Sequence, residues 1–485
     1  MEDSMESSIE RRLGLVVLGV VLGVGAALRV AWALSEDGLY WPDEVYQSLE
    51  PAHRLVFGYG LRAWEYIEGA RTWVLPALVA ACFELSRALG LPEPRGYLGL
   101  TRSLFGLMGA ATAWGSWRLA RGYGASTLTA AAGASLFALG SVPVYFAPRA
   151  LSENASALPV VLGLALALSP GASRRAVLGG ASLLGVAVLL RLQNGVFCVA
   201  LLGVLGARRE WRRTGEALGV LVLWAGVLGL MDRLTWGHWF QSARVYLDFN
   251  LVRGMASNWG TAPFAYYYTV LARSLGPTLC LVTLGLGVLA ARRAPGLFLL
   301  AIAFWLLHAL QPHKELRFLM PVLPVFAALA GMGLEELRGA LPPSPVRLAL
   351  PLWLGVLAGL SATRTGGLTF GQLGQYEHEK PRASAWDDFG PVNRLLIAAG
   401  HQPDVCGLKL ERLHVAWSGG YSYFHRDVPL YSGQGPGRGA RVYNYVITPT
   451  GLSGAGTVVA TQGPFALVRL GERCAPDPGW SSRLP

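Results

Sequence analysis

Charged residues are scarce in this chain: Asp, Glu, Lys and Arg together make up 15% of its 485 residues. A soluble globular protein carries about a quarter. Hydrophobic residues make up 53% of the sequence, and many lie in runs close to the roughly 17 to 25 residues that cross a bilayer as a helix. This composition excludes a pair of soluble domains and predicts a polytopic membrane protein.

Cysteine is also rare, with five in the whole chain. Cys82, Cys198 and Cys280 lie inside apolar runs, where Cys behaves as a small hydrophobic residue. Cys406 and Cys474 lie in the C-terminal part and would pair only in an oxidising compartment. The sequence alone favours two free thiols there, and a disulfide framework is excluded.

Several signatures of catalysis and ligand binding are missing. His238, His308 and His425 have no spacing suited to a metal site. Neither a glycine loop that cradles phosphate nor a Ser-His-Asp set can be identified. We therefore expect no metal and no cofactor. No cleavable signal peptide is evident, because the apolar run Leu13–Leu34 is longer than the apolar region of a signal peptide. We therefore expect this run to be the first transmembrane span.

The net charge of +11 comes from 41 Lys and Arg against 30 Asp and Glu. In a soluble protein it would suggest nucleic-acid binding. Here the arginines stand in pairs at the ends of apolar runs, as in Arg174-Arg175 and Arg292-Arg293, which is the pattern of cytosolic loops. With these pairs inside, the loops 35–72 and 232–263, the cluster 313–317 and the C-terminal region all face outward.

We expect an all-α bundle of about 11 to 12 transmembrane helices in residues 1–363, with outward loops at 35–72 and 232–263. Residues 364–485 contain no such run and alternate like a small α/β domain outside the membrane. We expect a helix there at 391–399 and strands at 405–408, 413–417, 443–447, 457–461 and 465–470. The charge pattern requires one of two early runs, Trp73–Leu91 or Ser103–Trp117, to be re-entrant or to lie along the interface. The runs are Leu13–Leu34, Trp73–Leu91, Ser103–Trp117, Ala125–Tyr145, Ala155–Ser169, Ala176–Leu190, Gly195–Ala207, Ala217–Met231, Ala265–Ala291, Gly296–Leu310, Phe318–Leu334 and Leu348–Leu360.

The first outward loop contains a predicted amphipathic helix. Pro42 suits its first position, and Asp43 and Glu44 follow in the first turn, where the helix dipole favours carboxylates. A carboxylate here could remove a proton from an attacking sugar hydroxyl. Taken singly, Glu50, Glu65 and Glu68 fit a helix whose acids merely face water as well as they fit a functional site. We expect Asp43, Gln47, Glu50 and Arg54 on the wet face and Val45, Leu49, Ala52 and Val56 on the opposite face.

A second charged cluster, His313-Lys314-Glu315-Leu316-Arg317, follows an apolar run and Pro312. Its cations can hold a phosphate or diphosphate by charge-assisted hydrogen bonds. The alternative is an interfacial anchor of long side chains, but such anchors are usually cytosolic and this cluster faces outward. Arg191 contacts either a lipid phosphate or the headgroup region. Weaker candidates beside apolar runs are Arg149, Ser152, Glu153 and Asn154, together with Gln193 and Asn194; of these, Arg149 and Gln193 could bind substrate.

In these segments the chain resembles the polyprenyl-phosphate-mannose-dependent mannosyltransferases, a family that includes the third GPI-anchor mannosyltransferase and the lumenal enzymes of N-glycan precursor assembly. HKELRF at 313–318 is the most specific element. Leu316 departs from the acidic residue often found there, and the loop 232–263 matches loosely. The other matching segments are DEVYQSLEPAH (43–53), FGYG (57–60), WE (64–65), GAR (69–71), PRALSEN (148–154), RLQN (191–194), GGYSYFHRDVP (419–429) and NY (444–445).

The resemblance implies a GT-C fold and an inverting transfer of mannose, or another hexose, from a polyprenyl- or dolichyl-phosphate donor to a lipid-linked glycan or glycolipid, without a metal. Short loops and a composition rich in Gly, Ala, Arg and Leu suggest a bacterial homologue whose active site faces the periplasm or exterior. The resemblance does not identify the acceptor. The alternative function is that of a secondary transporter or a lipid-linked sugar flippase. The predicted catalytic residues are Asp43 and Glu44; the donor phosphate residues are His313, Lys314, Arg317 and Arg191; the substrate contacts are Gln47, Glu50, His53, Glu65, Arg149, Gln193 and Glu315.

Overall fold

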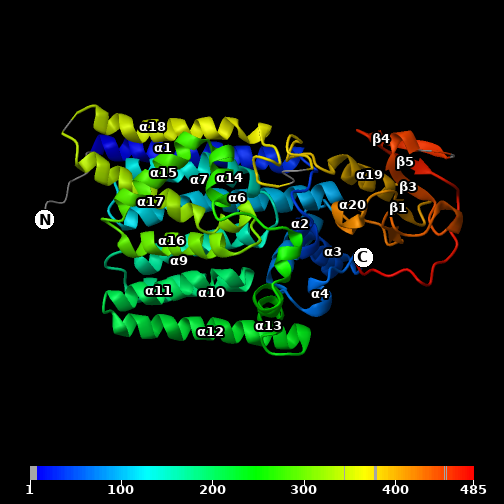
Figure 1. The fold of residues 1–485 in the computed structure, drawn as a ribbon, viewed down its shortest axis with the longest axis horizontal. Coiled ribbons are helices and arrows are strands. Elements are labelled where there is room, and N and C mark those ends of the chain that lie inside the picture. Colours follow the sequence, from blue (N-terminus) through cyan, green and yellow to red (C-terminus); the bar gives the residue numbers. More distant parts are fainter. Residues whose placement is uncertain (1–7, 343, 376–378, 453, 455, 485) are drawn as a thin grey trace. The chain divides into compact units, whose positions relative to one another are not determined.

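A computed structural model describes residues 8–342, 344–375, 379–452, 454 and 456–484. The chain is mostly helical and has one small sheet (Figure 1). It divides into two compact units. The first comprises the residues up to 33 together with 103–382, and the second comprises 34–102 together with 383–485. The first outward loop therefore shares a unit with the C-terminal region, although the two are far apart in sequence.

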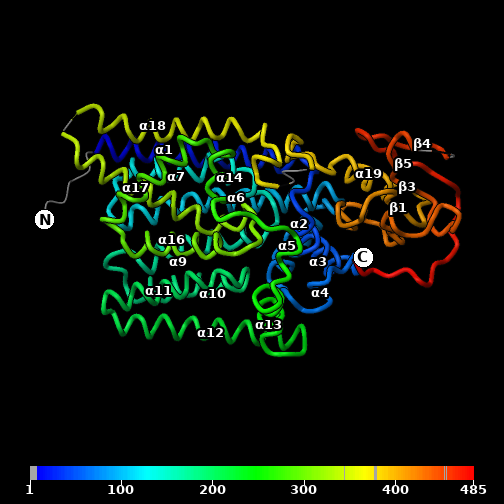
Figure 2. The backbone as a smooth tube through the Cα atoms, viewed as in Figure 1, coloured from blue at the N-terminus to red at the C-terminus, as the bar shows by residue number. Residues whose placement is uncertain are grey.

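The first unit is a helical bundle in which many helices run alongside one another (Figure 1). Packed pairs include α9 with α10, α7 with α17, and α10 with α12, and Figure 2 traces α10, α11 and α12 as neighbouring segments. The helices are α1 (Ser8–Ser35), α6 (Pro94–Gly122), α7 (Thr127–Leu139), α8 (Ser141–Phe146), α9 (Ser152–Leu168), α10 (Arg174–Leu190), α11 (Gly195–Ala207), α12 (Trp211–Trp236), α13 (Gln241–Leu247), α14 (Tyr266–Leu275), α15 (Pro277–Ala290), α16 (Pro295–Leu310), α17 (Leu323–Gly339) and α18 (Val346–Thr363); α1 and α6 each extend past a unit boundary.

Small residues let the central helices approach closely. Every residue of α7 is buried, and this helix is rich in alanine. A Cβ atom at Gly133 would lie 2.6 Å from the carbonyl oxygen of Ala327 in α17. Such close approach is how helices pack where lipid removes the hydrophobic driving force.

By length and composition, three of the described helices could cross a membrane: Ser8–Ser35, Trp211–Trp236 and Val346–Gly367. Five further apolar helices have 10 to 17 residues. The helical bundle is thus confirmed, but the count of 11 to 12 long spans is not. One reason is that glycine and proline divide two of the predicted runs: 265–291 is broken at Gly276 and Pro277, and 125–145 is broken at Gly140.

The second unit contains the outward loop and a five-stranded sheet of order β2-β1-β3-β5-β4. Strand β1 pairs in parallel with β2 and β3, whereas β5 is antiparallel to β3 and β4. Val446 of β3 and Ala466 and Val468 of β5 form a buried hydrophobic cluster within the sheet. The elements are α2 (Pro42–Glu44), α3 (Glu50–Phe57), α4 (Glu65–Glu68), α5 (Val74–Ala88), α19 (Gly390–Gly400), α20 (Tyr421–Phe424), β1 (Leu408–Leu410), β2 (Leu430–Tyr431), β3 (Tyr445–Pro449), β4 (Thr457–Gln462) and β5 (Phe465–Arg469).

The fold class expected for the C-terminal region, a small α/β domain, is confirmed. The strand expected at 413–417 is instead a 3-10 turn, Val415–Trp417, and the two-residue strand β2 is too short to leave a pattern in the sequence. The proposed division into a catalytic module at 1–363 and a domain at 364–485 stays a prediction.

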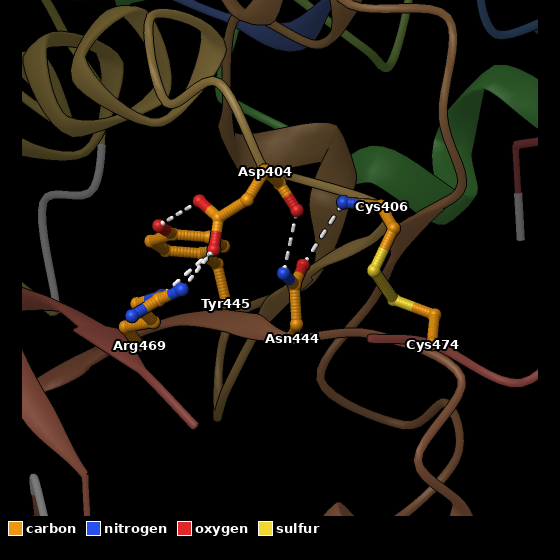
Figure 3. The surroundings of a disulfide bond; sticks show 6 residues. All are labelled: Asp404, Cys406, Asn444, Tyr445, Arg469 and Cys474. Atoms are coloured by element: carbon orange, nitrogen blue, oxygen red, sulfur yellow. Dashed lines mark hydrogen bonds and ion pairs between the residues drawn. A yellow bond between two sulfur atoms is a disulfide. The ribbon is translucent and has the colours of Figure 1, made fainter. Parts of the chain in front are cut away.

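Cys406 and Cys474 form a disulfide, with Cα atoms 5.9 Å apart (Figure 3). Beside it, the side chain of Asn444 accepts from the Cys406 amide at 2.9 Å and donates to the Asp404 carbonyl at 2.7 Å. The expectation of two free thiols was wrong, because a separation of 68 positions hides the proximity that folding creates. The tail beyond the disulfide reaches Arg62, whose amide donates to the Ser482 carbonyl at 2.7 Å.

Candidate active site

The predicted helix of the outward loop contains a π-helical turn. After α2, the five residues Val45–Leu49 form this turn, and α3 continues from Glu50. Such turns are rare and are frequently found at functional sites. Val45, Leu49 and Ala52 are buried as expected, but Glu50 is fully buried too. The prediction of Glu50 on the wet face was wrong, because Leu61 and the distant Ser422 cover its carboxylate.

Asp43 lies half-buried in α2, and its carboxylate acts on Glu65 across the loop. Burial raises the pKa of Glu65 to about 7, and the negative charge of Asp43 acts in the same direction. Gln47 connects the two segments by donating from Nε2 to Glu65 Oε1 at 2.9 Å. Asp43, Gln47 and Glu65 thus belong to one polar group, as a site for accepting a proton requires.

Glu44 has a different setting from its neighbour. It is 1% exposed, and its Oε2 accepts from the Tyr40 amide at 3.3 Å. Asp43 retains partial exposure. Of the two acids, Asp43 is therefore the better placed to reach a substrate hydroxyl.

Glu50 and His53 lie on another face of the same helix. The Glu50 carboxylate accepts from the Leu61 amide at 2.8 Å and from the Ser422 amide at 2.5 Å. Burial raises the pKa of Glu50 to about 7, while these amides act to lower it. His53 is also buried, and its Nδ1 lies 3.0 Å from the Tyr59 carbonyl, to which it donates. Burial lowers the pKa of His53 to about 3.

In the first unit, two arginines and two glutamates form a buried ionic group. Arg191 Nη1 lies 2.7 Å from Glu153 Oε1, and Arg317 Nε lies 3.6 Å from the same oxygen. Arg317 also binds Glu315 through both Nε and Nη2, at 2.8 and 2.9 Å. The four charges balance. The predicted cations Arg191 and Arg317 are thus brought together, but Glu153 bridges them and Glu315 also binds Arg317, so they do not form an open anion site.

The other two polar members of the 313–317 cluster, His313 and Lys314, bind Glu315 and nearby backbone carbonyls. His313 Nε2 lies 3.2 Å from Glu315 Oε1. Although burial opposes it, the Arg317 guanidinium and the His313 side chain lower the pKa of Glu315 to about 2. Lys314 Nζ donates to the Ala262 carbonyl at 2.7 Å and to the Gln311 carbonyl. Lys314 therefore already has acceptors, and its predicted role toward phosphate rests on charge alone.

Arg149 and Gln193 lie elsewhere in the first unit. The guanidinium of Arg149 stacks 4.4 Å from the ring centroid of Tyr145. The amide of Gln193 donates to the Tyr246 hydroxyl. Their roles as substrate contacts stay predictions, as do those of the other predicted site residues. Among the residues that the structure describes, no group of three or more His, Cys, Asp or Glu side chains could hold a metal ion.

Two further residues belong to these groups. Glu153, a weaker candidate from the sequence, lies between the two arginines, and His425 Nδ1 lies 2.9 Å from His53 Nε2. Sequence reasoning gave His425 no role, although it stands in the segment 419–429 that resembles the family. His53 and His425 are 372 positions apart along the chain, so no spacing pattern could pair them.

The Alg9-like mannosyltransferase family matches residues 21–376. A GPI mannosyltransferase 3 from Yarrowia lipolytica is 31% identical over 330 residues, covering 65% of this chain and 62% of the relative. A GPI alpha-1,2-mannosyltransferase 3 from Danio rerio is 28% identical over 61% of this chain and 56% of its own length. The chain thus spans about three fifths of the curated relatives it matches.

Solved structures share the fold at low sequence identity. The ArnT protein of Cupriavidus metallidurans bound to undecaprenyl phosphate has a TM-score of 0.58 at 15% identity, covering 96% of this chain and 99% of that one. The archaeal oligosaccharyltransferase AglB of Archaeoglobus fulgidus has a TM-score of 0.54 at 14% identity, covering 91% and 70% respectively.

Proposed function

Because the chain belongs to the Alg9-like mannosyltransferase family, we propose that it is a membrane glycosyltransferase that moves a sugar, mannose in the first instance, from a polyprenyl-phosphate donor to a lipid-linked glycan or glycolipid. The family match over residues 21–376 is the observation that carries this proposal. It favours transfer chemistry over the transporter and flippase alternative. The half-buried carboxylate of Asp43, beside Gln47 and Glu65, supplies a fitting chemical group.

The reaction is a single displacement with inversion. An acceptor hydroxyl oxygen attacks the anomeric carbon of the donor, and the bond from that carbon to the phosphate oxygen breaks. The lipid phosphate leaves with the bonding electrons, and the hydroxyl proton passes to the Asp43 carboxylate. The phosphate is a stable leaving group, so no acid is needed on its side.

The donor phosphate requires cations, and we assign this role to Arg191 and Arg317. Their guanidinium groups are buried and are oriented by Glu153 and Glu315. Positioned donors of this kind stabilise developing charge without having to reorganise during the reaction. The undecaprenyl phosphate bound by ArnT belongs to the same chemical class of ligand.

A donor-consumption assay in detergent with polyprenyl-phosphate-mannose and a mixed glycolipid acceptor fraction tests the proposal. The wild type should release polyprenyl phosphate, and Asp43→Asn should lower turnover by a factor of about 10² or more. Glu68→Gln, which changes an exposed acid of the same loop, is the matched control and should keep its activity. Near-normal turnover of Asp43→Asn would remove Asp43 from the mechanism, and no donor consumption by the wild type would overturn the proposed reaction.

A further inference from the structure

The segment 415–425, here called the brace segment, contacts the outward loop at several points. Within the second unit, the Tyr46 hydroxyl donates to the Val415 carbonyl at 2.6 Å and to the Ser418 carbonyl at 3.2 Å. The rings of Trp41 and Trp417 meet edge to face, with centroids 5.3 Å apart. The brace segment includes most of the GGYSYFHRDVP motif, which the proposed reaction does not use.

Three residues of the loop helix form the contact face. Tyr46 lies in the π-helical turn, and Glu50 and His53 lie in α3 directly after it. Each contacts the brace segment: Tyr46 as above, Glu50 through the Ser422 amide, and His53 through His425. The helix thus has two working faces, because Asp43 and Gln47 are directed to Glu65 instead.

Glu50 is the centre of this contact face. It has no exposed surface, and its two carboxylate oxygens accept from different segments, Oε2 from Leu61 and Oε1 from Ser422. A carboxylate placed in this way ties α3, the turn after it and the brace segment together. With both oxygens engaged in a buried setting, it is suited to fixing the loop rather than to contacting a sugar.

The backbone of the brace segment is shaped to receive this carboxylate. Gly420 has φ of +55°, a region that other residues rarely adopt. A Cβ atom there would lie 2.8 Å from Glu50 Oε1. The amide of the preceding residue, Gly419, is held by Asn393 Oδ1 at 2.7 Å, and Asn393 also donates to the Asp37 carbonyl at 2.7 Å. The loop is therefore tied to the C-terminal part at Asp37 as well as at Glu50.

We propose that Glu50 is a positioning residue, which sets the orientation of Asp43 by fixing the loop helix to the brace segment; this rests on the proposed role of Asp43 as the base. The C-terminal region is then part of the catalytic apparatus, although it supplies no reacting group. A displacement of about 1 Å at a catalytic group can lower the rate by a factor of about 100.

Gly420→Ala tests this without changing any residue of the proposed site. It should lower kcat by a factor of about 10 to 100 and leave the donor KM unchanged, because the donor phosphate is assigned to the other unit. Gly439→Ala makes the same chemical change where a Cβ atom meets nothing within 4 Å, and it should behave as the wild type. Tyr46→Phe, a milder variant that removes only the hydroxyl, should show the same selective fall in kcat to a smaller extent.

Hydrogen exchange supplies a readout that does not depend on activity. In the full-length protein, Gly420→Ala and Tyr46→Phe should both speed amide exchange over residues 43–61, and Gly439→Ala should not. Unchanged exchange in the first two variants, or a fall in activity through donor KM alone, would overturn the positioning role. If exchange accelerates while the wild type consumes no polyprenyl-phosphate-mannose, the reaction proposed above fails and the structural tie between Glu50 and the brace segment stands.

Discussion

At the scale of single residues, burial decides what the acids and histidines of the outward loop can do. Asp43 and Glu44 are neighbours, yet one is half-buried and the other is 1% exposed with an oxygen engaged by the Tyr40 amide. The sequence could identify the pair but could not choose between them. That choice depends on the backbone around Tyr40, which no local pattern encodes.

His53 gives a pH dependence with a definite sign. Its folded pKa is lowered to about 3 from the usual 6.5 by burial, with His425 acting in the same direction. Below pH 6.5 the unfolded chain binds a proton at this position that the folded chain does not. The free energy of unfolding should therefore fall as pH drops from 6.5 toward 3, by about 1 kcal/mol between pH 6.5 and 5.5.

Denaturation of the purified protein in detergent measures this effect. The titratable groups around the ring include His425, Tyr59 and Tyr97, so the difference between variants is the readout. His53→Gln should lose less stability than the wild type over that interval, and the exposed His401→Gln should track the wild type. Parallel profiles for His53→Gln and the wild type would refute the assignment.

At the scale of elements, the main difference from expectation is the π-helical turn. The 3.6-residue period correctly placed Val45, Leu49 and Ala52 in the core. It misplaced Glu50, because the segments that cover this carboxylate, at Leu61 and at Ser422, are not part of the helix and leave no trace in its period. The same limit applies to the strands: β3, β4 and β5 were expected, whereas β2 has two residues and depends entirely on its pairing with β1.

The ionic group on η5 (Leu316–Leu319) and its neighbours makes a prediction about donor use. Arg317→Lys keeps the charge but loses the planar guanidinium group, whose Nε and Nη2 both donate to Glu315. A hydrogen bond to a charged partner is worth about 1.5 to 3 kcal/mol. We therefore expect the KM for the donor to rise about 10-fold to 100-fold, since about 1.4 kcal/mol corresponds to a factor of ten.

Steady-state kinetics with both substrates varied would measure this. The acceptor KM should change little, and Arg174→Lys, at an exposed arginine, should leave both constants unchanged. A rise in acceptor KM alone would show that this cluster binds the acceptor and not the donor. Lysine is preferred to alanine as the replacement because removing one charge of a buried pair leaves the other uncompensated and destabilises the fold.

At the scale of the whole molecule, the charge pattern makes a prediction about the side of the membrane that each segment occupies. The arginine pairs predict that residues 174–175 lie in the cytosol and that the C-terminal region lies outside. The disulfide between Cys406 and Cys474 is in keeping with an oxidising compartment for that region.

Cysteine labelling of intact cells with an impermeant maleimide tests this sidedness. The free cysteines at 82, 198 and 280 are replaced by alanine, while the disulfide pair is kept because it does not react with maleimide. Ala440→Cys, at an exposed position, should be labelled in intact cells, and Arg175→Cys only after permeabilisation. The reverse pattern would show that the charge argument assigned the sides wrongly.

The tie between Glu50 and Ser422 also has a consequence for biosynthesis. The two residues are 372 positions apart, so the ribosome completes the loop helix long before it makes the segment that fixes it. The tail that reaches Arg62 through Ser482 is made later still. On the positioning role proposed for Glu50, a partly synthesised chain therefore lacks the contacts that orient Asp43. On that proposal, the loop helix is made early but becomes active only after the C-terminal region has folded against it.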